Sequence, residues 1–91
     1  MVLNIKVLGP GCINCYRVEQ QTVAALEALE EENPSLEATI QHVADYEEII
    51  KYPIMFTPGL VINEKLVCAG RIPSEAEVRQ WLISALAEAE A

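Results

Sequence analysis

The stretch Leu8-Gly9-Pro10-Gly11-Cys12-Ile13-Asn14-Cys15-Tyr16 decides how this chain folds. Residues 2–8, which lead into it, are apolar and β-branched and predict a strand. The Gly-Pro-Gly turn then breaks the strand, and a helical pattern of apolar residues begins at about residue 13. The sequence therefore predicts a Cys-x-x-Cys pair where a strand turns into a long helix.

This placement gives the two sulfurs different roles. The first turn of a helix has unpaired N–H groups and carries about half a positive charge, which stabilises a thiolate. A cysteine in such a position can have a pKa of about 3.5–7.5 instead of about 8.5. Cys12 lies nearer the helix end and is the predicted nucleophile. Cys15 lies one turn further on, faces the buried side of the helix, and is close enough to form a disulfide with Cys12.

Length and composition set the class of protein. With 91 residues, of which 52% are hydrophobic, we expect one domain over residues 1–91 with a modest core. The net charge of −8 disfavours nucleic acids and anionic membrane surfaces as partners. No apolar run approaches the ~18 residues of a membrane span, and no leader pattern follows Met1, so we expect a cytoplasmic protein. Three cysteines do not resemble the framework of a disulfide-stapled secreted protein, and they favour a catalytic or metal-binding pair.

Helix and strand patterns alternate along the rest of the chain. A helix is predicted over residues 13–32, strands over 36–43, 54–62 and 65–69, a short helix from Asp45 to residue 51, and a terminal helix that opens at Ser74. Ser74 and Glu77 form a capping box for that last helix, on which Trp81 is predicted to be a core residue. Pro58 lacks an N–H group, which places it at a strand beginning or in a special turn.

The order of these elements, with Cys-x-x-Cys after the first strand and Thr57-Pro58 before the third, resembles the thioredoxin fold in its minimal form. Residues 11–15, 56–63 and 69–74 are similar to the small thioredoxin-like redox-active disulfide proteins. The resemblance implies a βαβαββα chain with three helices and a four-stranded mixed sheet in the order 2-1-3-4. It also implies that the bond before Pro58 is cis, and that Thr57 and Pro58 face the dithiol and bind an extended peptide substrate.

The function that this resemblance implies is thiol-disulfide exchange with a protein or a small-thiol disulfide. Cys12 attacks the substrate, Cys15 resolves the mixed disulfide, and a separate reductase or dithiol regenerates the pair. The predicted redox group is the Cys12–Cys15 disulfide itself, without a further cofactor. The Gly-Pro-Gly loop lacks the spacing of a dinucleotide-binding loop, so electrons must come from a partner. We expect a monomer.

Two departures from the family pattern lead to further expectations. Thioredoxins carry a buried carboxylate six residues before the first cysteine, whereas this chain carries Lys6. One hypothesis is that Lys6 lies beneath the dithiol and favours its thiolate form as a nearby cation. The alternative is an exposed strand lysine. Residues 69–75 lack the acidic pair with which glutaredoxins contact glutathione, so specificity for glutathione is not expected.

Other readings of the cysteines remain open at this point. A Cys-x-x-Cys pair also suits Cu(I), although small copper-carrying domains have the order βαββαβ. A zinc site needs four ligands, and the soft side chains available are Cys12, Cys15, Cys68 and His42. A binding module that keeps the fold without turnover is a third class. His42 alone is interpreted as an edge-exposed or hydrogen-bonded strand residue, and Cys68 as a small buried hydrophobic residue.

Overall fold

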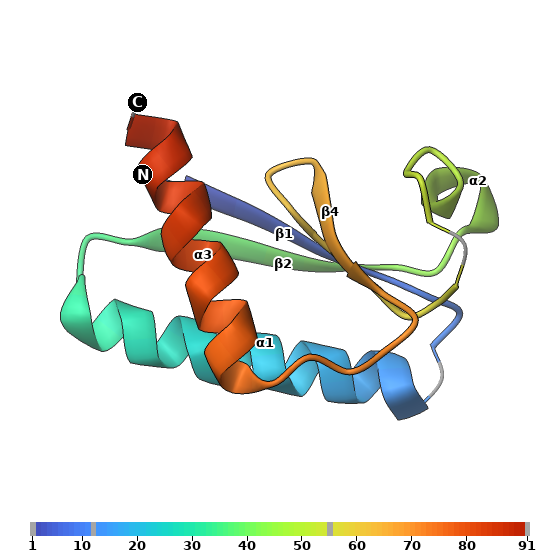
Figure 1. Cartoon of the computed structure of the whole chain (residues 1–91), viewed down its shortest axis with the longest axis horizontal. Helices are drawn as coiled ribbons and strands as arrows, with labels where there is room; N and C mark the ends of the chain where they lie inside the picture. The colour runs from blue at the N-terminus through green and yellow to red at the C-terminus, as the bar shows by residue number, and fades with distance from the viewer. Residues whose placement is uncertain (1, 12, 55, 91) are drawn as a thin grey trace.

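The predicted order of helices and strands is confirmed by the computed structural model, which describes residues 2–11, 13–54 and 56–90. The elements are β1 (Val2–Leu8), α1 (Ile13–Glu32), β2 (Glu37–Val43), α2 (Tyr46–Ile49), β3 (Gly59–Ile62), β4 (Lys65–Ala69) and α3 (Glu75–Glu90), as Figure 1 shows. This order, βαβαββα, differs from that of the small copper-carrying domains.

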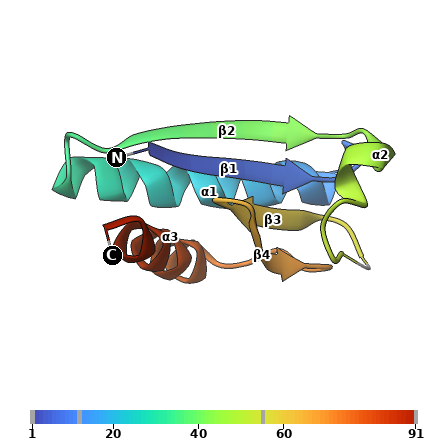
Figure 2. The same ribbon diagram turned by 90° about the horizontal axis from the view of Figure 1, so that it is seen from above.

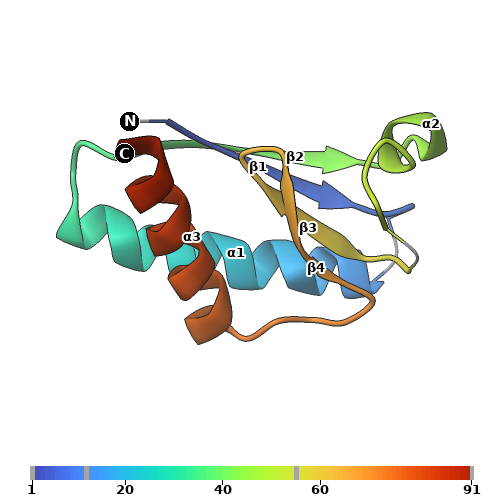
Figure 3. The ribbon, with the colours of Figure 1, turned by 45° about the horizontal axis from the view of Figure 1, so that its top comes forward.

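The four strands form one mixed sheet in the order β2-β1-β3-β4, as the thioredoxin resemblance implied. β1 runs parallel to β2 and antiparallel to β3, and β3 pairs with β4 as an antiparallel hairpin (Figure 3). The helix α1 is the crossover between the two parallel strands. Because β1 and β2 are parallel, both end at the same edge of the sheet, where α2 also lies (Figure 2).

The two faces of the sheet are covered by different helices. Alternate β1 residues, Leu3, Ile5 and Val7, are fully buried in a large cluster with side chains of α1 and α3. Leu8 points to the other face, where it packs with Val43, Val61 and Ile49 of α2. The first face therefore holds the main core, and α2 covers only part of the second.

The apolar stripe of α1 is confirmed residue by residue. Its buried side chains are those that the spacing of three and four residues predicts: Cys15, Val18, Thr22, Ala25, Leu26 and Leu29. The capping box of α3 is also present, because the Glu77 N–H donates to Ser74 Oγ at 3.2 Å and the Ser74 N–H donates to Glu77 Oε1 at 3.2 Å. Trp81 of α3 is partly buried against the main core.

Three predicted boundaries are wrong, of which the smallest error is at β2, which begins at Glu37 instead of Leu36. The sequence predicts the third strand over residues 54–62, of which residue 55 lies outside the described residues, but β3 begins at Gly59. Pro58 has no N–H to give to the sheet, so the ladder starts only after it. The short helix α2 ends at Ile49, with Ile50 as its C-cap, rather than at residue 51. Within the described ranges, no helix has the length and apolarity to cross a membrane.

Candidate functional site

The site is built where β1 ends and α1 begins. The Gly9 N–H donates to the Val43 carbonyl at 2.9 Å, which extends the pairing of β1 with β2 by one residue. Gly11 then adopts a φ of 95°, a left-handed conformation that glycine accepts at no steric cost. Cys12, the predicted nucleophile, lies outside the described residues, whereas its neighbours Gly11 and Ile13 are described and α1 begins at Ile13.

Cys15 packs directly against the loop that precedes the motif. Its side chain is 1% exposed and belongs to the main core cluster. A Cβ placed on Gly9 would collide with Cys15 Sγ, and it would lie 3.9 Å from the Cα of Pro58. Gly9 therefore allows the sulfur and the loop around Pro58 to approach one another, and only a residue without a side chain fits there.

The Thr57-Pro58 peptide bond is cis, as the resemblance implied. Pro58 is buried and Thr57 is exposed. The Pro58 carbonyl accepts a hydrogen bond from the Gly70 N–H at 2.9 Å, which ties this loop to the residue after β4. The fold thus brings Pro58, Gly9 and Cys15 together from three elements, while the substrate-binding role of Thr57 and Pro58 stays a prediction.

His42 lies on β2 opposite Val7 of β1. Its Nε2 is 3.0 Å from the carbonyl oxygen of Gly9, so the hydrogen-bonded interpretation of this histidine is confirmed. Its Cε1 also lies 3.9 Å from where a Cβ of Gly11 would be. Sequence reasoning did not place His42 at this loop. The predicted parallel pairing of the two strands could have placed it there, because the carboxyl ends of parallel neighbours lie at the same edge of the sheet.

Lys6 has partners on the face of the sheet that carries α2. Its Nζ donates to Tyr52 Oη at 3.0 Å and to Glu64 Oε1 at 2.9 Å, and Tyr52 Oη donates to Glu64 Oε2 at 2.9 Å. These bonds, with Tyr52 first, raise the pKa of Lys6, and the bond from Lys6 lowers the pKa of Glu64. Lys6 alternates with Ile5 and Val7, which pack on the α1 side with Cys15. Tuning of the thiols by Lys6 stays a prediction.

Cys68 is a buried residue of β4, as interpreted from the sequence. It is 9% exposed and lies in the same core cluster as Cys15. Burial raises the pKa of its thiol, and the charge of Arg71 opposes this shift. A thiol of this kind is unreactive compared with a cysteine at a helix end. Among the residues that the structure describes, no group of three or more Cys, His, Asp or Glu side chains is arranged to hold a metal ion.

An apolar pocket of about 360 Å³ adjoins the site on the α2 side. Its walls come from the loop before the motif, from α2 and its flanks, and from the loop before β3: Pro10, Ala44, Tyr46, Ile49, Ile50, Ile54, Phe56 and Thr57. Large apolar side chains stand exposed around it, with Tyr46 73% and Phe56 68% accessible. Exposed apolar surface of this kind around a pocket is typical of a binding site.

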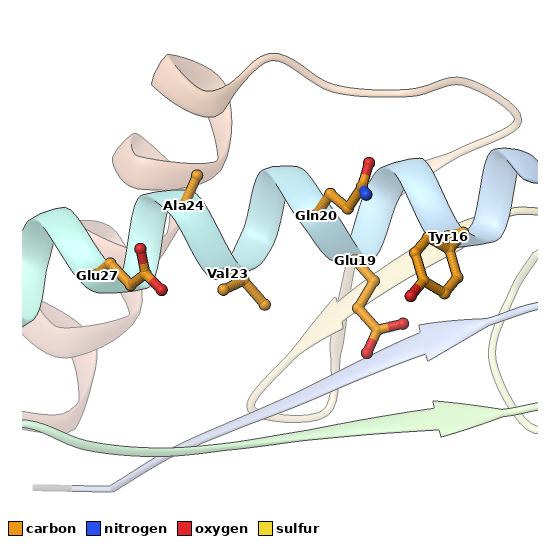
Figure 4. Close-up of a pocket in the computed structure, with 6 residues that line it drawn as sticks. All are labelled: Tyr16, Glu19, Gln20, Val23, Ala24 and Glu27. Atoms are coloured by element: carbon orange, nitrogen blue, oxygen red, sulfur yellow. The ribbon is translucent and has the colours of Figure 1, made fainter.

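A second hollow, of about 340 Å³, lies along α1. All its lining residues come from that one helix, from Tyr16 next to Cys15 to Glu27 (Figure 4). It combines two carboxylates, Glu19 and Glu27, with the small apolar side chains Val23 and Ala24. With walls from one helix alone, this hollow is a weaker candidate for a binding site than the pocket beside Thr57.

Comparison with known proteins covers nearly the whole chain. Residues 3–83 match a protein-family model described as "Thioredoxin domain". A thioredoxin from Methanocaldococcus jannaschii is 32% identical over 82 residues, which cover 90% of this chain and 88% of that protein. A thioredoxin from Methanothermobacter thermautotrophicus is 25% identical over 81 residues, which cover 89% of this chain and 99% of that protein. The matched range includes both cysteines of the motif and Thr57-Pro58.

Proposed function

The chain belongs to the thioredoxin domain family, and from this premise we propose that it is a thiol-disulfide oxidoreductase that exchanges a disulfide between Cys12 and Cys15. The observation that carries the proposal is the meeting of Cys15 Sγ, Gly9 and the cis Pro58 at the start of α1. A second cysteine three residues before Cys15 completes a dithiol at that point.

The exchange proceeds in two displacements. The Cys12 thiolate attacks one sulfur of the substrate disulfide, and the other substrate sulfur leaves as a thiolate that takes up a proton. Cys15 then loses its proton and attacks the sulfur of Cys12, which releases the second substrate thiol and forms the Cys12–Cys15 disulfide. Two electrons pass from the pair to the substrate. An external dithiol or reductase returns them, and the chain supplies no further cofactor.

The apolar pocket favours a protein disulfide as substrate over a small anionic thiol. The lining residues that the structure describes offer apolar and aromatic surface, and none of them is a lysine or arginine that would pair with the carboxylates of glutathione. The net charge of −8 also repels small anions. We propose that an apolar side chain next to the substrate cysteine occupies this pocket while the substrate backbone lies along Thr57 and Pro58. We propose that the protein acts as a monomer in the cytoplasm, where a reductase can regenerate its dithiol.

The first test is the reduction potential of the pair. Metal-free protein is equilibrated with glutathione or dithiothreitol at graded ratios, and its thiols are counted by alkylation and mass. We expect a reversible two-electron Cys12–Cys15 disulfide at about −270 to −200 mV, the range of thioredoxins and glutaredoxins. Cys68→Ala is the matched control and should leave the couple in place. Absence of this disulfide at every ratio would overturn the proposed function.

The second test compares substrates. The rate constant for reduction of a protein disulfide with apolar flanking residues should exceed that for oxidised glutathione. Phe56→Ser, which removes an exposed apolar wall of the pocket, should slow the protein substrate and leave the glutathione rate unchanged. Equal slowing of both substrates would contradict the assignment of the pocket.

A further inference from the structure

We propose that His42 is a positioning residue for the dithiol, because its ring holds the loop of residues 9–11 that leads into Cys12. The inference rests on the proposed function. The chain has one histidine, which lies 30 positions after Cys12 in sequence. It meets the loop before the motif through the pairing of two parallel strands.

The hydrogen bond of His42 adds a side-chain contact just beyond the last residue pair of the β1–β2 ladder. Leu8 and Val43 form the last pair of the register, and the Gly9 N–H then bonds to the Val43 carbonyl at 2.9 Å. The Gly9 carbonyl lies 3.0 Å from His42 Nε2. A carbonyl oxygen only accepts hydrogen bonds, so the proton lies on Nε2 and the ring donates. Both polar backbone groups of Gly9 are thus held by β2.

The position of Gly9 matters because Gly9 lies between Cys15 of α1 and the loop that contains Pro58. The Cα of Gly9 packs against Cys15 Sγ and lies near Pro58, so a Cβ at this position would not fit. The imidazole continues along the loop, with Cε1 3.9 Å from the Cβ position of Gly11, the residue before Cys12. A shift of the loop would therefore change the contacts of Gly9 with Cys15 and with the loop of Pro58.

Loss of this hydrogen bond should weaken thiolate chemistry more than it weakens the fold. A thiolate gains stabilisation from a helix end only within the first turn, so a loop that moves outward loses part of that interaction. Lys6 bonds to Tyr52 and Glu64 on the face that carries α2. His42 instead contacts the loop itself, so it is better placed to control the geometry of the pair.

The experiment compares His42→Phe with His42→Gln. Phenylalanine keeps a planar ring and removes the donor, whereas glutamine keeps an N–H donor and removes the titratable group. The readouts are the rate constant for alkylation of Cys12 in the reduced protein and that for reduction of a protein disulfide, both at pH 7. We expect His42→Phe to slow both by about threefold to tenfold, the range that one hydrogen bond carries, and His42→Gln to stay within about twofold of the wild type.

A matched control separates positioning from stability. Ile40 lies two residues earlier on the same face of β2 and is half-buried against the main core, so Ile40→Val is the control. It should lower the melting temperature and leave both rate constants unchanged. Wild-type rates in His42→Phe, or an equal loss in His42→Gln and His42→Phe, would overturn the role of the hydrogen bond.

A structural readout keeps this inference separable from the proposed function. The ¹⁵N chemical shifts of the His42 ring report which nitrogen carries the proton, and the neutral form should carry it on Nε2. Amide exchange at Gly9 and Gly11 should become faster in His42→Phe. Neither measurement depends on disulfide chemistry, so a wild type without a Cys12–Cys15 couple would remove the proposed function alone. A ring protonated on Nδ1 instead would remove the positioning role.

Discussion

The two faces of the sheet are completed in different ways. Under α1 and α3, side chains of these two helices and of the sheet pack into one large buried cluster that includes Cys15. Under the four-residue helix α2, the buried cluster is smaller and, among the described residues, consists of Leu8, Val43, Ile49 and Val61. Beside that cluster lie the polar group of Lys6, Tyr52 and Glu64 and the apolar pocket. The comparison indicates that the α1 face keeps Cys15 fixed, and that the α2 face leaves surface available for a partner.

The largest expected effect is the cost of truncating the core on each face. Leu82 of α3 is fully buried on the α1 face, and Ile49 of α2 is buried on the other. We expect Leu82→Ala to lower the free energy of unfolding by about 2–5 kcal/mol. Ile49→Ala should cost less, because a single-turn helix at the sheet edge can relax around the missing atoms. Urea unfolding of the reduced proteins measures both values, and equal losses would break the comparison.

A smaller effect is expected from adding one methyl group next to each face. In Gly9→Ala the new Cβ meets Cys15 Sγ, which is enclosed by the core, whereas in Gly59→Ala it meets the terminal methyl group of Ile54 on the α2 side. The end of the isoleucine side chain can rotate away, but the sulfur cannot move without displacing α1. Gly9→Ala should therefore cost about 1–3 kcal/mol, and Gly59→Ala less.

The same pair of variants is informative about the site. Gly9→Ala should also change the reduction potential of the Cys12–Cys15 couple, since it pushes Cys15 away from the loop. Gly59→Ala should leave the potential at its wild-type value. A larger destabilisation in Gly59→Ala than in Gly9→Ala would show that the α2 face is the more rigid of the two.

The sequence predicts those parts of the structure that depend on residues close to one another in the chain. The buried stripe of α1 follows from apolar spacing, and the start of α3 follows from Ser74 and Glu77, since each signal involves residues within a few turns of one another. The boundary of β3 was wrong because apolar residues before Pro58 look like strand residues, although the proline ends the ladder.

The contacts that shape the site have no local signal. Tyr52 is 46 residues from Lys6, and Glu64 is 58 residues from it, so the pairing of this lysine depends on the strand order and on the path of the chain after α2. The bond from His42 to Gly9 spans 33 residues and depends on the register of two parallel strands. The strand-to-helix pattern predicted the place of the cysteine motif, and the family resemblance implied the cis proline, but neither predicted the side chains around them.

The polar group on the α2 face should matter less for stability than either core. Tyr52→Phe removes the hydrogen bonds from Lys6 and to Glu64 and keeps the aromatic ring. We expect the melting temperature to fall by a few degrees, less than it falls in Gly9→Ala.

Lys6→Met removes the cation from the same group and also tests whether Lys6 tunes the thiols. If Lys6 favours the Cys12 thiolate, the pKa of Cys12 should rise slightly, because Glu64 already offsets part of the lysine charge. An unchanged pKa would remove that hypothesis.

The smallest effect is expected at the edge of the α1 face, where α3 begins. Two hydrogen bonds from Arg71, at 2.6 and 3.1 Å, and one from the Ser74 N–H hold the pKa of Glu77 at about 2, below its ordinary value of 4.5. A lowered carboxyl pKa contributes stability that is complete above pH 4.5 and is lost as the pH falls through about 2.

The melting temperature of the wild type should therefore exceed that of Glu77→Gln at pH 6, and the difference should shrink between pH 4.5 and 2. Glu75→Gln makes the same charge change in the same helical turn and keeps the Arg71–Glu77 pair, so it is the control for charge alone. Because both partners are exposed, added salt should reduce the difference at pH 6. A difference that stays constant down to pH 2 would mean that the Arg71–Glu77 pair contributes nothing through its charge.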